Sequence, residues 1–331
     1  MATLREIAQK AGVSIRTVSR ALSGAADVRA QTRESIERIS KELNYRPNPL
    51  ARGLKLRRGY VVPVIVREPE ELAFAKVCVL ERELRSAGYT TQLIFNAGGA
   101  EGEAEHLEQA LGYRPAAVVL FSAVREGEAE HLRLLHDSGT PYVLIDRRPL
   151  PGLDAVSIDR AAGVAGAVEH LLRGAHRNVF YLGPAEGDER TKGFARGFRE
   201  AGLRPPRNWA VTGFKSSFEG GRRAASELVR RHPEATAAFV YSDAMAYGVL
   251  KGLAESGVGV PGRMSVVGFD DRSPSRYVSP PLSTVAHPHE EVGRLAAEVL
   301  LGKIAGEIRP GKGSRVAVPR FVQRDSTREL E

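Results

Sequence analysis

The stretch TLREIAQKAGVSIRTVSRALSG, residues 3–24, predicts two short helices joined by a tight turn at Gly12. Thr3 and Glu6 have the spacing of a capping box, which marks the start of the first helix. The apolar residues of this helix recur at helical spacing and form one stripe: Leu4, Ile7, Ala8 and Ala11. Ser14 is a good N-cap for the second helix. The stretch therefore has the pattern of a helix-turn-helix unit.

The second helix is expected to expose a basic face. Its buried face is formed by Val18, Ala21 and Leu22. At about 100° per residue, Arg16 and Arg20 project from the opposite side, with Ser19 beside them. The fork of an arginine matches the O6 and N7 atoms of guanine in the major groove. On its own, the stretch is compatible with two interpretations, a DNA-reading unit and a helical hairpin with a solvated basic face.

The net charge of +8 is concentrated at one end of the chain. Residues 1–58 hold 13 Lys or Arg and 5 Asp or Glu, so this segment carries the whole excess. The remaining residues hold 35 of each kind, out of totals of 48 and 40. Such segregation indicates a polyanionic partner, which we interpret as nucleic acid. A membrane surface is disfavoured because no basic helix here also carries large apolar residues.

A third helix is expected to close a small core, with Ile36, Ile39 and Leu43 on its inner face. The segment RPNPLARGLKLRRGY, residues 46–60, follows it. Asn48 and Pro49 suit a helix start, but a helix of one to two turns is too short to be stable alone. Its leucines have no obvious packing partner: Leu50, Leu54 and Leu56. Two interpretations stay open, a helix that folds on a partner and a basic linker.

From residue 60 onward, short apolar runs alternate with helical segments. We expect strands at 61–66, 91–95, 117–121, 142–145, 155–158, 179–182, 210–214, 238–241 and 264–269, and a last one around 315–323. The helices expected between them include 71–86, 101–111, 127–138, 161–173, 190–201, 216–231 and 244–256. This alternation predicts parallel sheets covered on both faces. Four such units precede Asp146 and about four follow it, which favours an α/β core of two doubly wound subdomains.

The composition and the missing motifs exclude several classes of protein. No apolar run approaches the length of a membrane span and no leader is visible, so we expect a soluble, cytoplasmic protein. The glycine-rich GPAEG at 183–187 does not match a dinucleotide or phosphate loop, and no nucleophile elbow or metal-binding set is present. We therefore expect no enzyme activity, no cofactor and no metal. The single Cys78 is compatible with a packed side chain or an exposed thiol.

The motifs T-L-R-E-I-A-Q-K-A-G-V-S-I-R-T-V-S-R-A-L, L-N-Y-R-P-N and L-A-R-G-L resemble the DNA-binding headpiece of the lactose-repressor (LacI/GalR) family. The resemblance continues along almost the whole chain. It implies a helix-turn-helix domain at 1–46, a hinge helix at 47–58 and a periplasmic-binding-protein-like core at 59–331. The core would comprise an N-subdomain (about 59–159 and 288–318) and a C-subdomain (about 160–287 and 319–331). The chain would cross between them near Asp159, Ala286–Pro288 and Val318–Arg320.

The same resemblance implies roles for residues of the headpiece. Ile15, Arg16 and Arg20 would read the major groove, and Thr17 and Ser19 would bind phosphates. Leu54 would wedge into the minor groove together with its dimer mate and kink the duplex. The complete set of expected DNA-binding residues is Thr3, Ser14, Ile15, Arg16, Thr17, Ser19, Arg20, Arg29, Asn48, Leu54 and Lys55.

Polar residues at strand ends are the candidates for binding a small-molecule effector, because ligands of such folds bind at the carboxyl ends of the strands. Arg190 begins R-T-K-G-F, which is similar to the R-x-x-G-F element of the family. Asp and Arg side chains hold sugar hydroxyls in paired hydrogen bonds. The complete set of expected effector-binding residues is Arg67, Ser122, Asp146, Arg147, Asp159, Arg190, Phe214, Ser242, Asp270 and His287. Asp243 is expected to cap the helix that follows it.

The sequence departs from the family pattern in three places. Arg67-Glu68-Pro69-Glu70 replaces an Asn-Pro-Phe stretch, the loop at 183–189 is short, and Arg160 stands where Asn is frequent. Arg67, Arg147 and Arg190 together would make the pocket positive. An anionic effector therefore stays open beside a neutral sugar.

The sequence as a whole predicts a homodimeric repressor of pseudo-palindromic operator DNA, nucleoid-associated when bound and without a membrane partner. A sugar-like effector would control the hinge helix and hence DNA binding. The alternative is a corepressor-dependent regulator that senses a nucleobase-like or other anionic metabolite. More remote alternatives are a sugar-binding transport protein and a Rossmann-type enzyme. Because the chain ends soon after its last expected strand, we expect a dimer and not a tail-assembled tetramer.

Overall fold

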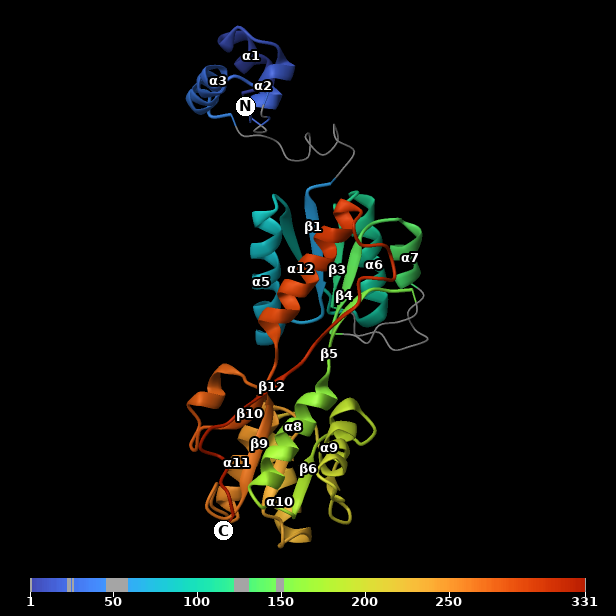
Figure 1. Cartoon of the computed structure of the whole chain (residues 1–331), viewed down its shortest axis with the longest axis vertical. Helices are drawn as coiled ribbons and strands as arrows, with labels where there is room; N and C mark the ends of the chain where they lie inside the picture. The colour runs from blue at the N-terminus through green and yellow to red at the C-terminus, as the bar shows by residue number, and fades with distance from the viewer. Residues whose placement is uncertain are drawn as a thin grey trace. The chain divides into compact units, whose positions relative to one another are not determined.

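The computed structural model describes residues 2–22, 25, 27–45, 59–121, 131–146 and 152–330. The chain divides into two compact units, Met1–Tyr60 and Val61–Glu331, and each is described by itself (Figure 1). Several predictions fall outside the described residues: Asn48, Leu54, Lys55, Ser122, Arg147 and the hinge at 47–58. No described helix combines the length and the apolar character of a membrane-spanning segment.

The described residues of the first unit form three helices, α1 (Leu4–Ala11), α2 (Ile15–Leu22) and α3 (Ala30–Glu42). The capping box of α1 is confirmed, because the Thr3 N–H donates to the Glu6 carboxylate at 2.7 Å and the Glu6 N–H donates to Thr3 Oγ1 at 3.3 Å. Gly12 has a left-handed backbone, with φ of 64°, and turns the chain toward α2. The helices enclose a core of Ile7, Ala8, Val18, Ala21, Ile36 and Ile39. The predicted third helix closes this core.

The first sheet of the second unit is fully parallel, with strand order β11-β5-β4-β3-β1-β2 among the described residues. Its strands are β1 (Val61–Val66), β2 (Thr90–Phe95), β3 (Val118–Leu120), β4 (Tyr142–Ile145), β5 (Ala155–Ile158) and β11 (Arg315–Ala317). Side chains of α5 (Glu71–Ser86) and α12 (His289–Ala305) cover one face. Side chains of α6 (Gly99–Gly112) and α7 (Leu132–Asp137) cover the other. We call this sheet and its helices the first lobe.

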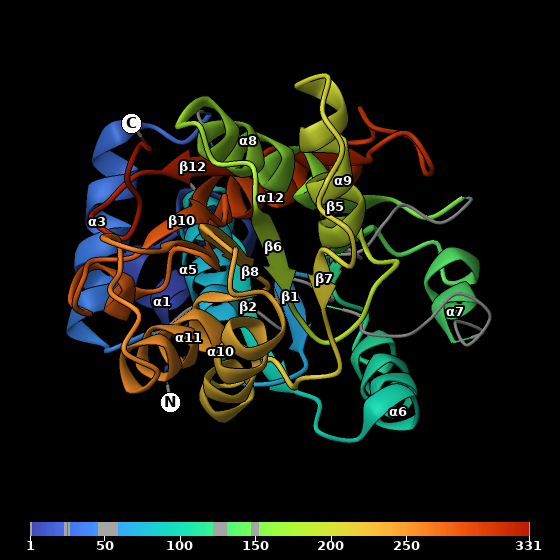
Figure 2. The ribbon, with the colours of Figure 1, turned by 90° about the horizontal axis from the view of Figure 1, so that it is seen from below.

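The second sheet has the order β12-β10-β9-β8-β6-β7 and is parallel except for the antiparallel pair of β10 and β12. Its strands are β6 (Val179–Leu182), β7 (Ala210–Val211), β8 (Ala237–Val240), β9 (Ser265–Asp270), β10 (Ser283–Ala286) and β12 (Arg320–Val322). Its helices are α8 (Arg160–Arg173), α9 (Glu189–Glu200), α10 (Phe218–Arg231), α11 (Asp243–Glu255) and the 3₁₀ turn η1 (Ser273–Arg276). Figure 2 shows α8 with α9 and α10 with α11 on opposite sides of the sheet, which we call the second lobe.

Short connections join the two lobes within the described residues. The chain passes from β5 to α8 at Asp159, from β10 to α12 at His287–Pro288, and from β11 to β12 at Val318–Pro319 (Figure 1). Every connection returns directly into a helix or strand of the opposite lobe. The ends of β4, β5, β9 and β10 therefore lie near the junction of the lobes.

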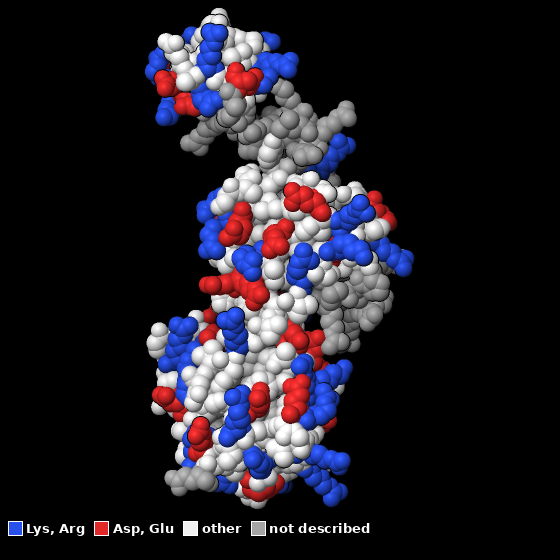
Figure 3. All heavy atoms as spheres, viewed as in Figure 1, with Lys and Arg blue, Asp and Glu red and all other residues white. Residues whose placement is uncertain are grey.

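The structure corrects three expectations about the strands. The strand expected around 315–323 is two short strands in different sheets, separated by the connection at Val318–Pro319. The strand expected at 210–214 ends at Val211. β10 is absent from the expected strands because its sequence is half polar, yet Ser283 and Thr284 are both fully buried. Figure 3 shows acidic and basic side chains interspersed over one face of the second unit, in line with its balanced charge.

Candidate functional site

Helix α2 has one face buried in the core of the first unit and one face in solvent. Ser14 caps its N-terminus, because Ser14 Oγ accepts the Thr17 N–H at 3.1 Å and lies 2.9 Å from Thr17 Oγ1. Val18 and Ala21 are buried against the other helices, as the helical pattern predicts. The cap and the core fix the direction of the helix, and with it the residues that it exposes.

The solvent face of α2 carries one apolar and two basic side chains. Ile15 is 42% exposed, so this face offers an apolar contact beside the arginines. Arg16 is exposed and has no ion pair within the described part of the chain. Arg20 is also exposed, and its Nε donates to Asp27 Oδ1 at 3.2 Å. A helix that exposes Arg16 in its first turn and Arg20 in its last turn has the shape and the donors to enter the major groove of DNA.

The remaining candidates in the first unit lie on α2 or at the starts of α1 and α3. Thr3 acts as the cap of α1 and Thr17 as the hydroxyl partner of Ser14. Ser19 is half-buried. Arg29 is exposed at the start of α3, where it makes no side-chain capping bond. Arg16 at the start of α2 and Arg29 at the start of α3 are therefore both accessible to phosphate groups.

In the second unit, an ionic cluster joins the two lobes; we call it the inter-lobe cluster and define it as Lys76, Asp146, Arg160, Glu189 and His287. Lys76 on α5 donates to Asp146, which follows β4. Arg160 begins α8 in the other lobe, lies 3.8 Å from Asp146 Oδ1 and donates to Glu189 at 3.4 Å. His287 Nε2, on a connection, lies 3.8 Å from the same Asp146 oxygen. Asp146 therefore has charged neighbours from both lobes.

The surroundings of Asp146 and His287 determine their protonation. Burial raises the pKa of Asp146, but neighbouring cationic groups, Lys76 above all, outweigh it, so the pKa is lowered and the carboxylate stays ionised. Burial and the neighbouring Lys76 charge lower the pKa of His287 to about 3. At neutral pH the cluster therefore contains an ionised aspartate and a neutral imidazole.

Arg190 lies next to Glu189 at the start of α9. A Cβ on Gly193 would lie 2.5 Å from the Ala161 carbonyl oxygen, so glycine allows α9 to pack closely on α8. This packing brings Glu189 and Arg190 beside Arg160 and the junction of the lobes. The guanidinium carbon of Arg190 lies 4.2 Å from the ring centre of Tyr241 and 4.4 Å from that of Phe269.

Asp270, at the end of β9, is the acidic neighbour of Arg190. It is buried, and burial raises its pKa to about 6 against the opposing charge of Arg190. Its φ of 125° is rare for a residue with a side chain, and its carbonyl oxygen accepts the His287 N–H at 3.1 Å. This backbone bond places Asp270 next to the inter-lobe cluster.

Three buried polar atoms of these groups have no hydrogen-bond partner among the described residues: Asp146 Oδ1, Arg190 Nε and His287 Nδ1. An unsatisfied buried polar atom costs free energy, so such atoms are rare in folded proteins. One carboxylate acceptor, one guanidinium donor and one imidazole nitrogen can together bind a compound that bears several hydroxyl groups. We refer to Asp146, Arg190, Asp270 and His287 as the inter-lobe site.

Two other candidates act as helix caps. Asp159 accepts the Ala162 N–H at 2.8 Å and caps α8. Ser242 accepts the Met245 N–H at 3.3 Å and caps α11, and its hydroxyl lies 2.6 Å from Ser216 Oγ. The expectation that Asp243 caps this helix is wrong. Asp243 is the first helical residue, and its buried carboxylate accepts from Thr284 Oγ1 and Ser275 Oγ, both at 2.6 Å.

Phe214 and Arg67 also lie differently from the expected pattern. Phe214 lies beyond the end of β7 and packs, partly buried, against the core of the second lobe. Arg67 is exposed and lies 3.7 Å from Glu68, so the positive pocket formed with Arg190 is not seen among the described residues.

The sequence reasoning did not identify Lys76 and Glu189 of the inter-lobe cluster. It also missed Arg272, whose Nε donates to Asp270 Oδ2 of the inter-lobe site at 3.4 Å. The sequence pattern could have revealed Lys76, because it lies between Leu72 and Leu80 on the apolar stripe of α5, where a lysine needs a buried partner. Its side chain is 3% exposed. Glu189 and Arg272 carry no such signal, since both are polar residues in polar segments.

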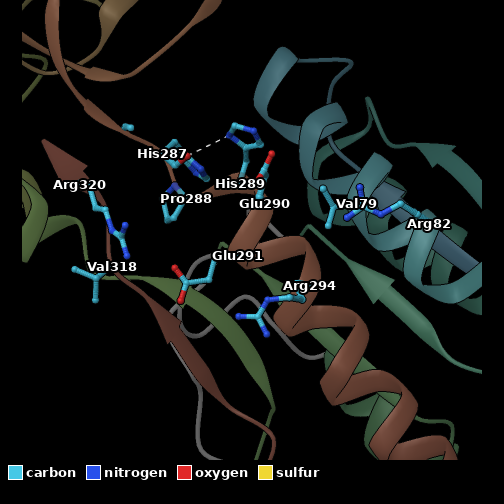
Figure 4. A pocket seen from close by; sticks show the side chains of 11 residues that line it. Val79, Arg82, His287, Pro288, His289, Glu290, Glu291, Arg294, Val318 and Arg320 are labelled. Atoms are coloured by element: carbon cyan, nitrogen blue, oxygen red, sulfur yellow. Dashed lines mark hydrogen bonds between the residues drawn. The ribbon is translucent and has the colours of Figure 1, made fainter. Parts of the chain in front are cut away.

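A groove of about 570 Å³ opens beside the connections between the lobes (Figure 4). Its walls are the connections at Ala286–Pro288 and Val318–Arg320, the side of α5 around Val79, and the first turns of α12. His289 Nδ1 lies 3.2 Å from the His287 carbonyl oxygen inside it. His287 therefore belongs both to this groove and to the inter-lobe site.

Comparison with known proteins agrees with both units. The family described as bacterial regulatory proteins, lacI family, matches residues 3–48, and the family described as periplasmic binding protein-like domain matches residues 168–327. The transcriptional regulator GntR of Pseudomonas aeruginosa is 34% identical over 312 residues, which cover 92% of this chain and 90% of the relative. The regulator GalS of Salmonella typhimurium is 30% identical over 317 residues, which cover 93% and 92%.

Solved structures share the fold over the full length. The transcriptional regulator CelR in complex with cellobiose has a TM-score of 0.71 at 28% identity and covers 98% of this chain and 100% of its own. The Lac repressor dimer bound to operator and the anti-inducer ONPF has a TM-score of 0.84 at 24% identity, with 99% of each chain covered, and supports the fold alone. The relatives are regulators and not enzymes. The chain is therefore a DNA-binding transcriptional regulator that belongs to the lacI family of bacterial regulatory proteins.

Proposed function

We propose that this regulator is a repressor that binds a pseudo-palindromic operator as a homodimer. The observation that carries the proposal is the solvent face of α2, where Ile15, Arg16 and Arg20 protrude from a capped helix held by a small core. One such helix reads only a half-site, and a two-fold symmetric dimer presents two of them. Ser19 on the same helix and Arg29 at the start of α3 would contact the phosphates.

We further propose that the segment 47–58 is a hinge whose helix forms on the operator, with Leu54 as a minor-groove wedge and Asn48 and Lys55 as further DNA contacts. The domain bounds expected from the sequence are part of this proposal. Effector binding between the lobes would change their arrangement and thereby favour or disfavour the hinge helix.

The effector that we propose is a neutral, sugar-like compound bound at the inter-lobe site. Each of the four described basic side chains around this site has a carboxylate neighbour: Lys76 has Asp146, Arg160 has Glu189, and Arg190 and Arg272 have Asp270. An anion would have to compete with these carboxylates, whereas hydroxyl groups complement the unpartnered donor and acceptor atoms. The solved cellobiose complex of CelR, a relative at 28% identity, supports a sugar.

The alternative is an anionic or nucleobase-like effector, possible through the unpartnered Nε of Arg190. The two classes are separated by a thermal-shift screen of the full-length protein against sugars, sugar phosphates and nucleobases. Stabilisation grows with the logarithm of the ligand concentration over its dissociation constant and reaches about 2.7 kcal/mol at a hundredfold excess. A rise in melting temperature with a neutral sugar supports the sugar-like effector. A rise with sugar phosphates or nucleobases alone supports the anionic or nucleobase-like effector in its place.

Selection of genomic fragments by the purified protein tests the operator proposal. We expect enrichment of a two-fold symmetric sequence whose binding weakens steeply with salt. Sedimentation of the protein–DNA complex should give two chains per enriched site. Selection of no common sequence, or one chain per site, contradicts the proposal.

A further inference from the structure

A set of hydrogen bonds links the lobes outside the inter-lobe cluster. Arg272 Nη2, in the second lobe, donates to Glu70 Oε1 in the first lobe at 2.7 Å. The Ser273 N–H donates to Glu71 Oε1 at 3.0 Å, and the Ser273 hydroxyl donates to the same oxygen. These bonds join segments that lie 202 residues apart in the sequence.

On the second lobe, these donors are rigidly held. The Arg272 N–H donates to Asp243 Oδ2 at 2.9 Å, and Asp243 is buried with two further hydroxyl donors. The following Ser275 belongs to the η1 turn and donates to the same carboxylate. A buried carboxylate with every oxygen engaged resists displacement, so the turn cannot move without the lobe.

On the first lobe, the acceptors belong to the start of α5. Glu70 is the N-cap of this helix, because its carboxylate accepts the Leu72 N–H at 3.4 Å, and Glu71 is the first helical residue. The same helix carries Lys76, which binds Asp146 of the inter-lobe site. Glu70 also lies in the segment where the sequence departs from the family pattern.

Arg272 makes a third contact, with Asp270 of the inter-lobe site. Its Nε donates to Asp270 Oδ2 at 3.4 Å, so one guanidinium bridges a carboxylate of the inter-lobe site and the cap of α5. A planar guanidinium suits this bridge because its donors are spread over a rigid fork, whereas the three donors of an ammonium group share a single nitrogen.

We propose that Arg272 is a positioning residue that ties Asp270 to Glu70, and that this tie, with the Glu71–Ser273 bonds, holds the lobes in their present arrangement. The inference rests on the proposed function only in taking Asp270 as an effector contact. An effector that draws Asp270 away weakens the tie, and one that orders Asp270 strengthens it. Arg272 thereby links occupancy of the site to the position of α5.

The test uses hydrogen–deuterium exchange of the full-length protein without any ligand, so that its outcome does not depend on the effector's identity. The variants are Arg272→Gln, Glu70→Gln and Arg272→Lys. The matched control is Arg276→Gln in the same turn, because Arg276 is exposed and has no cross-lobe contact within the described residues. The reporters are peptides containing the Leu72 and Ser273 amides, which donate to Glu70 and Glu71.

We expect Arg272→Gln and Glu70→Gln each to speed exchange on both lobes by about fivefold, and the double variant to do no more than either single one. Arg272→Lys should restore part of the protection at the Leu72 amide, while Arg276→Gln leaves both peptides unchanged. If the Gln variants match the control, or if only the mutated lobe responds, the tie is wrong. A sugar response in the thermal-shift screen would then still support the proposed function.

Discussion

The guanidinium of Arg190 stacks on the ring of Tyr241, with 4.2 Å between the guanidinium carbon and the ring centre. The ring of Phe269 lies 4.4 Å from the same carbon. Contact with two aromatic rings fixes the plane of the guanidinium and leaves its buried Nε without a hydrogen-bond partner among the described residues. A donor that is oriented before the ligand arrives loses little entropy on binding.

Replacing Arg190 with lysine should weaken effector binding although the charge is kept. The ammonium group lacks the planar fork and the flat stacking surface, and losing a hydrogen bond to a charged group costs roughly 1.5–3 kcal/mol, or at least tenfold in affinity. Calorimetric titration with the sugar found in the thermal-shift screen measures the change. Arg196→Lys on the same helix is the control, since the Arg196 side chain is 41% exposed and pairs with Glu200. Equal affinities for Arg190→Lys and Arg196→Lys would contradict the assignment.

Asp270 should make the stability of the protein depend on pH. Its pKa of about 6 lies above its ordinary value of 3.8, so its contribution to stability is present below 3.8 and is lost as the pH rises through about 6. The asparagine side chain of Asp270→Asn stays neutral, so the variant does not lose stability at this position as the pH rises. We expect the variant to gain stability relative to the wild type, on the order of 3 kcal/mol, as the pH is raised from about 4 to about 7.

Urea unfolding of the wild type and of Asp270→Asn across this range measures the difference in stability. His287 has a lowered pKa and therefore destabilises the folded protein in acid, but it does so equally in both proteins and cancels in the comparison. The variant should also bind the effector more weakly at neutral pH, since it lacks the ionised acceptor. A stability difference that does not change with pH would show that Asp270 titrates normally.

Much of the fold was predictable because its strands are continuous apolar runs. β4, β5 and β6 have the expected bounds, as has α5. β10 was missed because Ser283 and Thr284 are polar, and the groups that satisfy them lie far along the chain. The Ser283 N–H donates to Ser326, and the Thr284 hydroxyl donates to Asp243. Because these polar residues are buried against partners far along the chain, the local sequence lacks the run of apolar residues that marks the other strands.

The sequence predicted only those residues of the site that lie at the ends of strands, because neighbouring strand ends lie close together in a parallel sheet. Asp146 and Asp270 were expected at strand ends, and the structure places them there, at the junction of the lobes. Lys76 and Arg272 were not foreseen, because Lys76 meets its carboxylate 70 residues away and Arg272 meets Glu70 202 residues away. Spacing within one helix carries no information about such pairs.

Lys76→Met should destabilise the second unit. The lysine is 3% exposed, and its removal leaves the Asp146 carboxylate without its closest cation, which typically costs about 3 kcal/mol when a buried pair loses one partner. Urea unfolding followed by circular dichroism measures the loss. The double variant Lys76→Met with Asp146→Asn should recover part of it, because no uncompensated charge remains.

Arg85→Met on the same helix is the control for Lys76→Met. Arg85 is exposed and pairs with Glu81 four residues earlier, an interaction worth about 0.5 kcal/mol or less. A loss no larger in Lys76→Met than in Arg85→Met would mean that the buried pair contributes nothing to stability.

Arg16→Ala should reduce discrimination between operator and random DNA. Arg16 is exposed near the start of α2, and a bidentate contact with a base is worth about 1–3 kcal/mol, so operator affinity should fall by tenfold or more while affinity for random DNA changes little. Arg20→Ala should cost less, because Arg20 must leave Asp27 before it binds a base. Arg38→Ala is the control, since Arg38 lies on α3 and pairs with Glu42. Titrations at several salt concentrations separate base contacts from phosphate contacts, and equal losses on operator and random DNA would show that Arg16 binds the backbone.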